Sequence, residues 1–322
     1  MKQFGIAAAA ALAAIALLAL AASVFGHSPV AVLRVLIDGS LGSPFALRGT
    51  ILRSAPLLLT GLSVVLAFRA GAWNIGGEGQ FIVGALAALM AARYGAVASL
   101  LAAAVAGAAW ASIATLMRLW RNAPEVLTTI LLNFIAIHLL GWAVNGPLRE
   151  VSGQYPQSDR APVELPVVGG AHVGVFLALS AAIVIWWLLY RTTEGLRLRA
   201  TGLNPTAAQW AGINPAAQLA RAMAISGAIA GMAGGIELLG VTHRLFERFA
   251  VGYGYSGIAV ALLAQLHPIA AIASALFFGA LATGAGELQR SLEISAAIAT
   301  FAQAAVILIV IAFSGRRGGA HA

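Results

Sequence analysis

The chain has 322 residues, of which 61% are hydrophobic and only 9% are charged, and its mean hydropathy is +0.91. A soluble domain carries roughly 25% charged residues, so this composition excludes a soluble enzyme, a disordered chain and a disulfide scaffold. The sequence predicts an all-α polytopic membrane protein in which residues 1–322 form a single transmembrane domain. With about 20 residues for each span and about ten for each connection, the chain has room for about ten spans.

The charged and reactive residues narrow the function further. The net charge is +8, but the basic residues stand singly or in pairs between apolar runs, which is typical of membrane anchors and argues against nucleic acid as a partner. There is no cysteine, and the six histidines lie too far apart to indicate a metal or haem site. Lys2 is the only lysine and has no Gly-Lys-Ser/Thr context, so the chain has no P-loop. If ATP drives its work, another subunit must bind the nucleotide.

Apolar runs predict ten spans, separated by polar or glycine-rich connections. They cover about 4–25, 50–68, 80–92, 97–117, 126–145, 172–190, 222–240, 255–266, 268–285 and 294–313. The first run also resembles the core of a signal peptide, but its length of about 20 residues and the spans after it favour an uncleaved span. The run at 255–266 is short enough to cross only half of the membrane, and an interfacial helix is expected near 30–37.

Two polar connections determine the expected orientation. Residues 146–171 contain four prolines and form the longest soluble loop, whereas residues 191–221 are rich in arginine. Lys and Arg accumulate on the cytoplasmic side of membrane proteins. Together with Arg316 and Arg317, the arginines of 191–221 place that connection and both termini in the cytoplasm, and 146–171 in the periplasm.

Polar residues inside predicted spans are the first candidates for a solute pathway. Five such residues are Asn133, His138, Glu237, Gln265 and Gln303. Buried polar groups cost several kcal/mol when they lack a partner, so they face either a cavity or a neighbouring helix. The residues alone leave both interpretations open.

Two glycine patterns accompany these groups. The segment Trp73-Asn-Ile-Gly-Gly-Glu-Gly-Gln80 is the densest polar stretch beside a predicted span. Its glycines permit non-helical turns, and a break before a helix exposes backbone N–H groups that can bind a polar substrate. An ordinary glycine-rich connection explains the composition equally well. Gly227, Gly231 and Gly235 stand four residues apart, which favours close packing of two helices.

Local signals predict a short helix over about 205–211. Asn204 is a good N-cap, Pro205 suits the first helical position, and Gly212 suits the C-terminal stop. The small and aromatic residues of this helix suit docking into a groove on a partner protein. A surface turn is the alternative.

Several stretches together resemble one family, the permease subunits of bacterial ABC importers for simple sugars and nucleosides, within the branched-chain amino acid and ribose permease superfamily. The nucleoside branch is the closer match. The stretches follow the family order over about 70–285, and they are Trp73-Asn-Ile-Gly-Gly-Glu-Gly-Gln80, Pro124-Glu-Val-Leu-Thr-Thr-Ile-Leu-Leu-Asn133-Phe134, Gly146-Pro-Leu148, Gly202-Leu-Asn-Pro-Thr-Ala-Ala208, Ala211-Gly-Ile213, Gly252-Tyr-Gly-Tyr-Ser-Gly-Ile-Ala-Val-Ala-Leu-Leu-Ala264 and His267-Pro268. Two departures are Trp73, where the branch usually has Phe, and Ala264-Gln-Leu266, where a Gly-Arg/Lys-Asn type of sequence is commoner.

The resemblance implies a type II-like importer permease fold in a bacterial inner membrane. The implied partners are an ABC ATP-binding subunit with two ATPase domains in one chain, a second permease subunit that is identical or different, a periplasmic or lipoprotein solute-binding protein, and membrane lipids. It also implies that 203–212 is the coupling helix that docks on the ATPase. The contact residues would be Gly202, Asn204, Pro205, Ala207, Ala208, Trp210 and Gly212.

A substrate pathway is expected to be lined or supported by polar and aromatic residues. They are Asn74, Glu78, Gln80, Asn133, Phe134, Trp142 and Glu237. We expect Asn133 to hydrogen-bond a ribose hydroxyl, and Phe134 or Trp142 to stack on a base or a sugar face.

The expected solute is a nucleoside, with a simple sugar or a flavin-like vitamin as alternatives. An ion-coupled secondary transporter is disfavoured because no predicted span contains Asp for an ion relay. A membrane enzyme is disfavoured because no H-E-x-x-H motif, G-x-S-x-G motif or catalytic carboxylate pair is visible. We therefore expect no catalytic residue, metal or cofactor.

Overall fold

A computed structural model describes residues 26–151, 153, 155–250 and 252–295, and the single positions 13, 16, 297, 300, 301, 304, 305 and 308. Most of the predicted first span at 4–25 and most of the predicted tenth span at 294–313, including Gln303, lie outside the described residues.

Within that part of the chain the fold is helical, with one short hairpin. The elements are α2 (Pro29–Leu41), α3 (Pro44–Arg69), α4 (Gly77–Ala91), the 3-10 helix η1 (Ala92–Tyr94), α5 (Ala96–Arg121), α6 (Glu125–Asn145), β1 (Val167–Val168), β2 (Ala171–His172), α7 (Val173–Arg191), α8 (Thr193–Leu203), α9 (Pro205–Trp210), α10 (Pro215–Glu237), the π-helix η2 (Leu238–Thr242), α11 (Tyr253–Leu263) and α12 (Ala270–Leu292). The hairpin is antiparallel and pairs Val167 with His172.

Six helices of the described residues are long and apolar enough to cross a membrane: α3, α5, α6, α7, α10 continued to Thr242, and α12. Of the eight spans expected between residues 50 and 285, six coincide with these helices. The runs predicted as spans at 80–92 and 255–266 are helices of 15 and 11 residues. At 1.5 Å per residue both are shorter than the ~30 Å hydrocarbon layer.

Helices α3 and α10 form the centre of the protein. In the most apolar 18-residue window, 78% of α3 and 67% of α10 with η2 are buried, against 22% of α5 and 28% of α7. Helix α3 packs against α2, α7, α10, α11 and α12, and α10 packs in addition against α4 and α5. The outer faces of α5, α6 and α7 are apolar and exposed, which suits contact with lipid or with another subunit.

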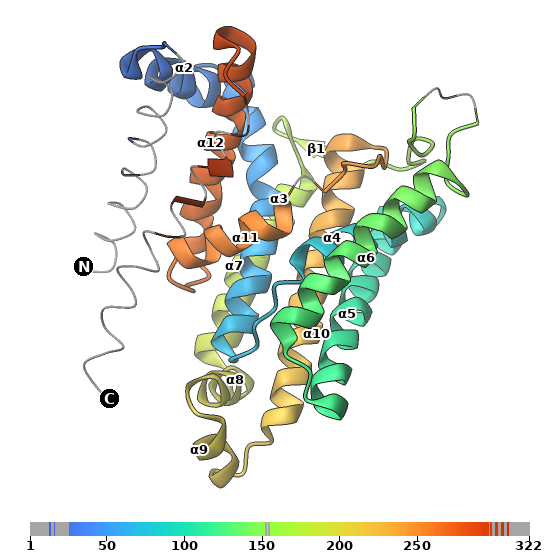
Figure 1. The fold of residues 1–322 in the computed structure, drawn as a ribbon, viewed down its shortest axis with the longest axis vertical. Coiled ribbons are helices and arrows are strands. Elements are labelled where there is room, and N and C mark those ends of the chain that lie inside the picture. The colour runs from blue at the N-terminus through green and yellow to red at the C-terminus, as the bar shows by residue number, and fades with distance from the viewer. Residues whose placement is uncertain are drawn as a thin grey trace.

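The two ends of the helical bundle differ in what they carry. Figure 1 shows α8 and α9 at one end, and α2 with the β1–β2 hairpin at the other. We refer to them as the α9 end and the hairpin end. The predicted loop at 146–171 lies at the hairpin end, where Ser158 N donates to Leu245 O (2.8 Å) and Arg244 pairs with Glu150 (2.6 Å).

The glycine stripe of α10 is a packing device, as its spacing predicts. A Cβ on Gly231 would collide with the carbonyl oxygen of Ala103 in α5, and one on Gly227 would collide with that of Gly107. A Cβ on Gly84 of α4 would likewise collide with the carbonyl oxygen of Gly231. The three helices therefore approach so closely that only glycine fits at their contacts.

Replacing Gly231 with alanine is expected to destabilise the protein by about 1–3 kcal/mol, because the added methyl group meets backbone that cannot rotate away. Thermal unfolding in detergent measures the change as a lower melting temperature. Gly141→Ala is the matched control, since Gly141 is also helical and has nothing within 4 Å of an added Cβ. Equal melting temperatures for the two variants would contradict this packing.

Candidate functional site

The break between α3 and α4 is held by the side chain of Asn74. Its Oδ1 accepts hydrogen bonds from Gly76 N (2.9 Å) and from Gln80 Nε2 (2.9 Å). Its Nδ2 donates to Gln80 Oε1 (3.0 Å) and to Ser226 Oγ of α10 (2.8 Å). Ser226 in turn donates to Ser63 O of α3 (2.9 Å). Asn74 and Gln80 are buried, and this arrangement joins the break to both central helices.

Asn133 of α6 supplies a second set of bonds to the same break. Its Oδ1 accepts from Gly79 N (2.8 Å), and its Nδ2 donates to Ile75 O (2.9 Å) and Tyr255 OH (3.1 Å). The side chain is fully buried. One amide therefore satisfies a free N–H at the start of α4 and a free carbonyl of the break, which are groups that a helix terminus leaves without partners.

Glu78 connects the start of α4 to the start of α11. Its Oε1 accepts from Gly252 N (2.9 Å) and its Oε2 from Gly254 N (2.7 Å). The two helix N-termini touch, since a Cβ on Gly254 would collide with Glu78 N. Helix N-termini carry partial positive charge and unpaired N–H groups, so a buried carboxylate is favourable between them.

Four of the seven residues predicted for the pathway thus lie together in one hydrogen-bond network. We call it the polar network, and its members are Ser63, Asn74, Glu78, Gln80, Asn133, Ser226 and Tyr255. Phe134 and Trp142 lie elsewhere, with 53% and 65% of their surface exposed on α6. Gln265 does not lie in a span, which corrects the expectation, because α11 ends at Leu263 and Gln265 belongs to the turn that follows.

Glu237, the remaining predicted pathway residue, lines a cavity of about 590 Å³. Its side chain hydrogen-bonds Tyr253, but its buried Oε2 has no hydrogen-bond partner. The walls come from α3, α10 with η2, residues 246–252, α11, α12, and Thr300 and Ala304 further along the chain. Described residues that line the cavity include Arg53, Val241, Phe246, Phe249, Tyr253, Tyr255, Ala259 and Ala282.

Sequence reasoning did not single out Arg53 or the aromatic residues of this cavity. Arg53 is a charge near the start of a predicted apolar span, a signal that points to a polar surface. Tyr253 and Tyr255 lie in a stretch that carried the family resemblance without being assigned to a site. Tyr253 and Tyr255 lie beside Glu237 because α11 packs against α3 and α12. No local sequence pattern predicts this tertiary packing.

A short helix lies where the sequence predicts one, at the α9 end. Asn204 Oδ1 accepts from Ala207 N (3.0 Å), Pro205 is the first helical residue, and Gly212 has a φ of +78°. Ala208 is buried, whereas Trp210 is 89% exposed. Gly202, at the end of α8, packs directly on the break before α4, since a Cβ there would collide with the carbonyl oxygen of Arg69.

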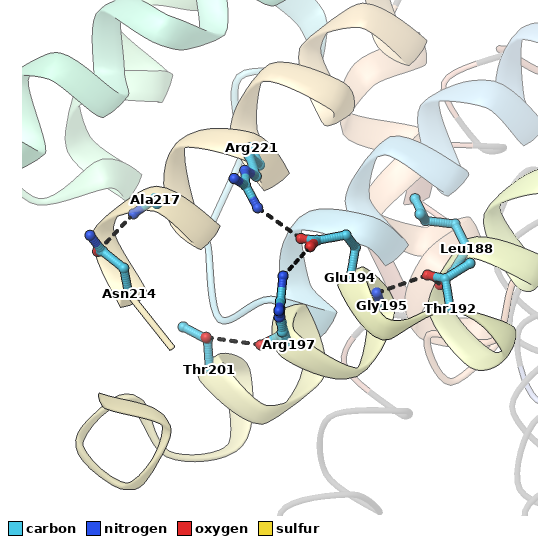
Figure 2. Close-up of polar contacts among 9 residues, drawn as sticks. All are labelled: Leu188, Thr192, Glu194, Gly195, Arg197, Thr201, Asn214, Ala217 and Arg221. Carbon is cyan, nitrogen blue, oxygen red and sulfur yellow. Dashed lines mark hydrogen bonds and ion pairs between the residues drawn. The ribbon is translucent and has the colours of Figure 1, made fainter. Parts of the chain in front are cut away.

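An ion-pair cluster joins α8 and α10, the two helices that flank α9 in the sequence. Figure 2 shows Glu194 of α8 paired with Arg197 on the same helix and with Arg221 of α10 (2.7 Å). Desolvation alone would raise the pKa of Glu194, but the two arginines hold it below its usual value, so the carboxylate is ionised at neutral pH. The elements on both sides of α9 are therefore tied to each other, and Thr192 and Asn214 cap the starts of α8 and α10.

Asn133→Leu is expected to lower stability by about 1–3 kcal/mol, because it leaves Gly79 N–H and Ile75 C=O buried without partners. The melting temperature in detergent measures the loss. Phe134→Leu, at the neighbouring exposed position, is the control and should unfold close to the wild-type temperature. An Asn133→Leu variant as stable as this control would show that the amide does not hold the break.

The comparisons with known proteins agree with this architecture. The family model of the branched-chain amino acid transport system permease component matches residues 46–312. The chain is 33% identical to the glucose ABC transporter permease protein TsgB13 of Haloferax volcanii, over 93% of this chain and 85% of that protein. It is also 33% identical to the guanosine ABC transporter permease protein NupP of Bacillus subtilis, over 89% of this chain and 87% of that protein.

A third relative, the nucleoside ABC transporter permease protein NupB of Lactococcus lactis, is 28% identical over 81% of this chain and 78% of its own length. These relatives carry different solutes in their names, and all of them are named as ABC transporter permease proteins. The chain is a multi-pass membrane protein and belongs to the ABC transporter permease family of the branched-chain amino acid transport system type.

Proposed function

We propose that this permease forms the translocation pathway for nucleosides in an ATP-driven importer. The supporting observation is the similarity to the guanosine permease NupP, which extends over 89% of this chain. The equal identity to the glucose permease TsgB13 makes a simple sugar the second candidate. A riboflavin import permease of Treponema pallidum, at 26% identity, keeps a flavin-like vitamin as a more distant alternative.

The partners follow from the type of transporter. An ABC permease does not itself hydrolyse ATP, so a separate ATP-binding subunit supplies the energy, and a solute-binding protein delivers the solute. We propose that a second permease subunit completes the pathway in a type II-like arrangement within a bacterial inner membrane. The exposed apolar faces of α5, α6 and α7 offer it contact area, and Phe134 and Trp142 lie on this surface.

Helix α9 is the proposed coupling helix, which places the α9 end and both chain termini in the cytoplasm. Trp210 and Leu203 project their side chains into open space, with 89% and 88% of their surface exposed. Large exposed aromatic side chains are typical anchors of a protein interface. Glu194 and Arg221 join α8 to α10, the two helices against which α9 packs, so movement of α9 would act on both.

The hairpin end then faces the periplasm and the solute-binding protein. Residues 146–171 are pinned there to the loop after η2, through Ser158–Leu245 and Glu150–Arg244 contacts. The hydrogen bond from Arg244 holds the pKa of Glu150 below its usual value, so this ion pair persists at neutral pH. A loop held in this way presents a fixed surface for docking.

Uptake by the complete transporter tests the solute. The permease is reconstituted in liposomes with the ATP-binding and solute-binding proteins of adjacent genes, and uptake of labelled guanosine, uridine and glucose is compared. We expect ATP-dependent uptake of nucleosides and none without ATP. ATP-dependent uptake of glucose without nucleoside uptake would overturn the proposed solute, and uptake without ATP would overturn the importer mechanism.

Trp210→Glu tests the coupling helix. A charge at the exposed anchor should weaken co-purification of the ATP-binding subunit by about tenfold or more, since buried interface tryptophans contribute about 2 kcal/mol or more. Val151→Glu is the matched control because Val151 is 99% exposed at the opposite end. If both variants retain the ATPase equally well, α9 is not the docking helix.

A further inference from the structure

Buried side-chain atoms without a hydrogen-bond partner occur at six described residues, Trp110, His172, Arg199, Gln218, Glu237 and His243, and of these Glu237 is the one that lines the cavity. Every side chain of the polar network that contacts the break before α4 already uses its hydrogen bonds within the protein. Glu237 does not, because its Oε2 is buried and has no partner within the described residues. A buried polar group without a partner is energetically costly, so an acceptor left free at a cavity wall points to a ligand as its partner.

The backbone around Glu237 is also irregular. Helix α10 ends at Glu237 and continues as the π-helix η2 over Leu238–Thr242. Short π-helical turns inside helices are rare and are found frequently at functional sites. The turn widens the helix where Glu237 and Val241 line the cavity, and it ends at His243 in the left-handed region with a φ of +56°.

The cavity walls have the chemistry of a site for an uncharged ring compound. Tyr253 hydrogen-bonds the Glu237 carboxylate and fixes its orientation. Phe246, Phe249 and Tyr255 add aromatic faces. Arg53 lies close enough to interact electrostatically with Glu237, so the site has a donor beside its acceptor. A volume of about 590 Å³ falls within the range of sites for small organic ligands.

The position of the cavity suits a solute in transit. Glu237 lies 22 residues after Pro215, which at 1.5 Å per residue places it about 33 Å along α10 from the α9 end. The cavity is therefore on the side of the bundle where a solute-binding protein would deliver its cargo.

We propose that this cavity is a solute-binding site inside a single permease subunit, in which Glu237 accepts a hydrogen bond from an N–H or O–H group of the solute. The aromatic side chains stack on its ring, and Arg53 donates to a carbonyl or ring oxygen. The assignment of a nucleoside to this site rests on the proposed function. The cavity itself follows from the placement of Glu237, Tyr253 and Arg53.

The absence of cysteine from the sequence permits a direct test. Ala282→Cys places a thiol in the cavity wall, and Ala273→Cys places one on an exposed position of the same helix outside the wall. Each variant is assembled with its ATPase in liposomes and reacted with a water-soluble methanethiosulfonate reagent, with and without guanosine or glucose. A saturating solute should slow modification at position 282 about tenfold, because about nine-tenths of the sites are occupied, and leave position 273 unchanged.

Glu237→Leu in the Ala282→Cys background removes the free acceptor and should abolish this protection. Glu237→Gln keeps one acceptor oxygen and should retain part of it. Glu247→Leu, which removes an exposed carboxylate outside the cavity wall, should retain all of it. Co-purification of the ATPase with every variant shows that the complex still assembles, so a loss of protection is then a loss of binding.

Three results would overturn the site. They are an unreactive thiol at position 282, no protection by guanosine in a complex that imports guanosine, and full protection in the Glu237→Leu variant. Protection by glucose alone, in a complex that imports only glucose, would retain the site and refute the nucleoside assignment. The failure of the site and the failure of the proposed solute are therefore distinguishable.

Discussion

No backbone N–H or carbonyl group can remain unpaired at membrane depth, and this constraint shapes the centre of the protein. Between α3 and α4 the helical bonds stop, and the side chains of Asn74 and Asn133 replace them, bonding Gly76 N, Gly79 N and Ile75 O. Because these amides supply the missing bonds, α4 can begin inside the protein. Glu78 at the start of α4 accepts hydrogen bonds from the start of α11, so both short helices begin in the interior without exposing polar backbone.

The same break is the meeting point between the α9 end and the interior. Gly202, three residues before the first residue of α9, leaves no space for a side chain against Arg69. Arg69 also donates to Leu266 O (2.9 Å) and Gln265 O (3.2 Å) in the turn that joins α11 to α12. A displacement of α9 therefore acts on the break and on the α11–α12 turn together. In the proposed mechanism, this contact is a route by which a movement of the coupling helix reaches the interior of the protein.

Local signals in the sequence were sufficient for some elements and not for others. Asn204, Pro205 and Gly212 specify a short helix from neighbouring residues alone, and α9 lies within one residue of the expected bounds. The runs at 80–92 and 255–266 form helices of 15 and 11 residues, and apolar composition alone does not distinguish such a short buried helix from a crossing one. The pairing of Asn74 with Ser226 joins residues 152 positions apart, and the described residues that line the cavity around Glu237 come from six separate segments. Such contacts are tertiary and leave no local pattern.

The polar network and Glu237 differ in whether their hydrogen bonds are already used within the protein, and this difference is the basis for proposing a structural role for the network and a binding role for Glu237. Rearranging Asn74 or Asn133 around a solute would expose the break, so their cost of reorganisation opposes a direct role in binding. Glu237 has an unused acceptor and can bind without breaking any bond within the described residues. A site built on one free carboxylate oxygen and a few aromatic faces binds weakly, which suits a carrier that must release its solute after each cycle. If the proposed site and coupling helix are correct, the delivering protein supplies the high affinity, and the membrane site has only to favour the correct solute while α9 changes the conformation around it.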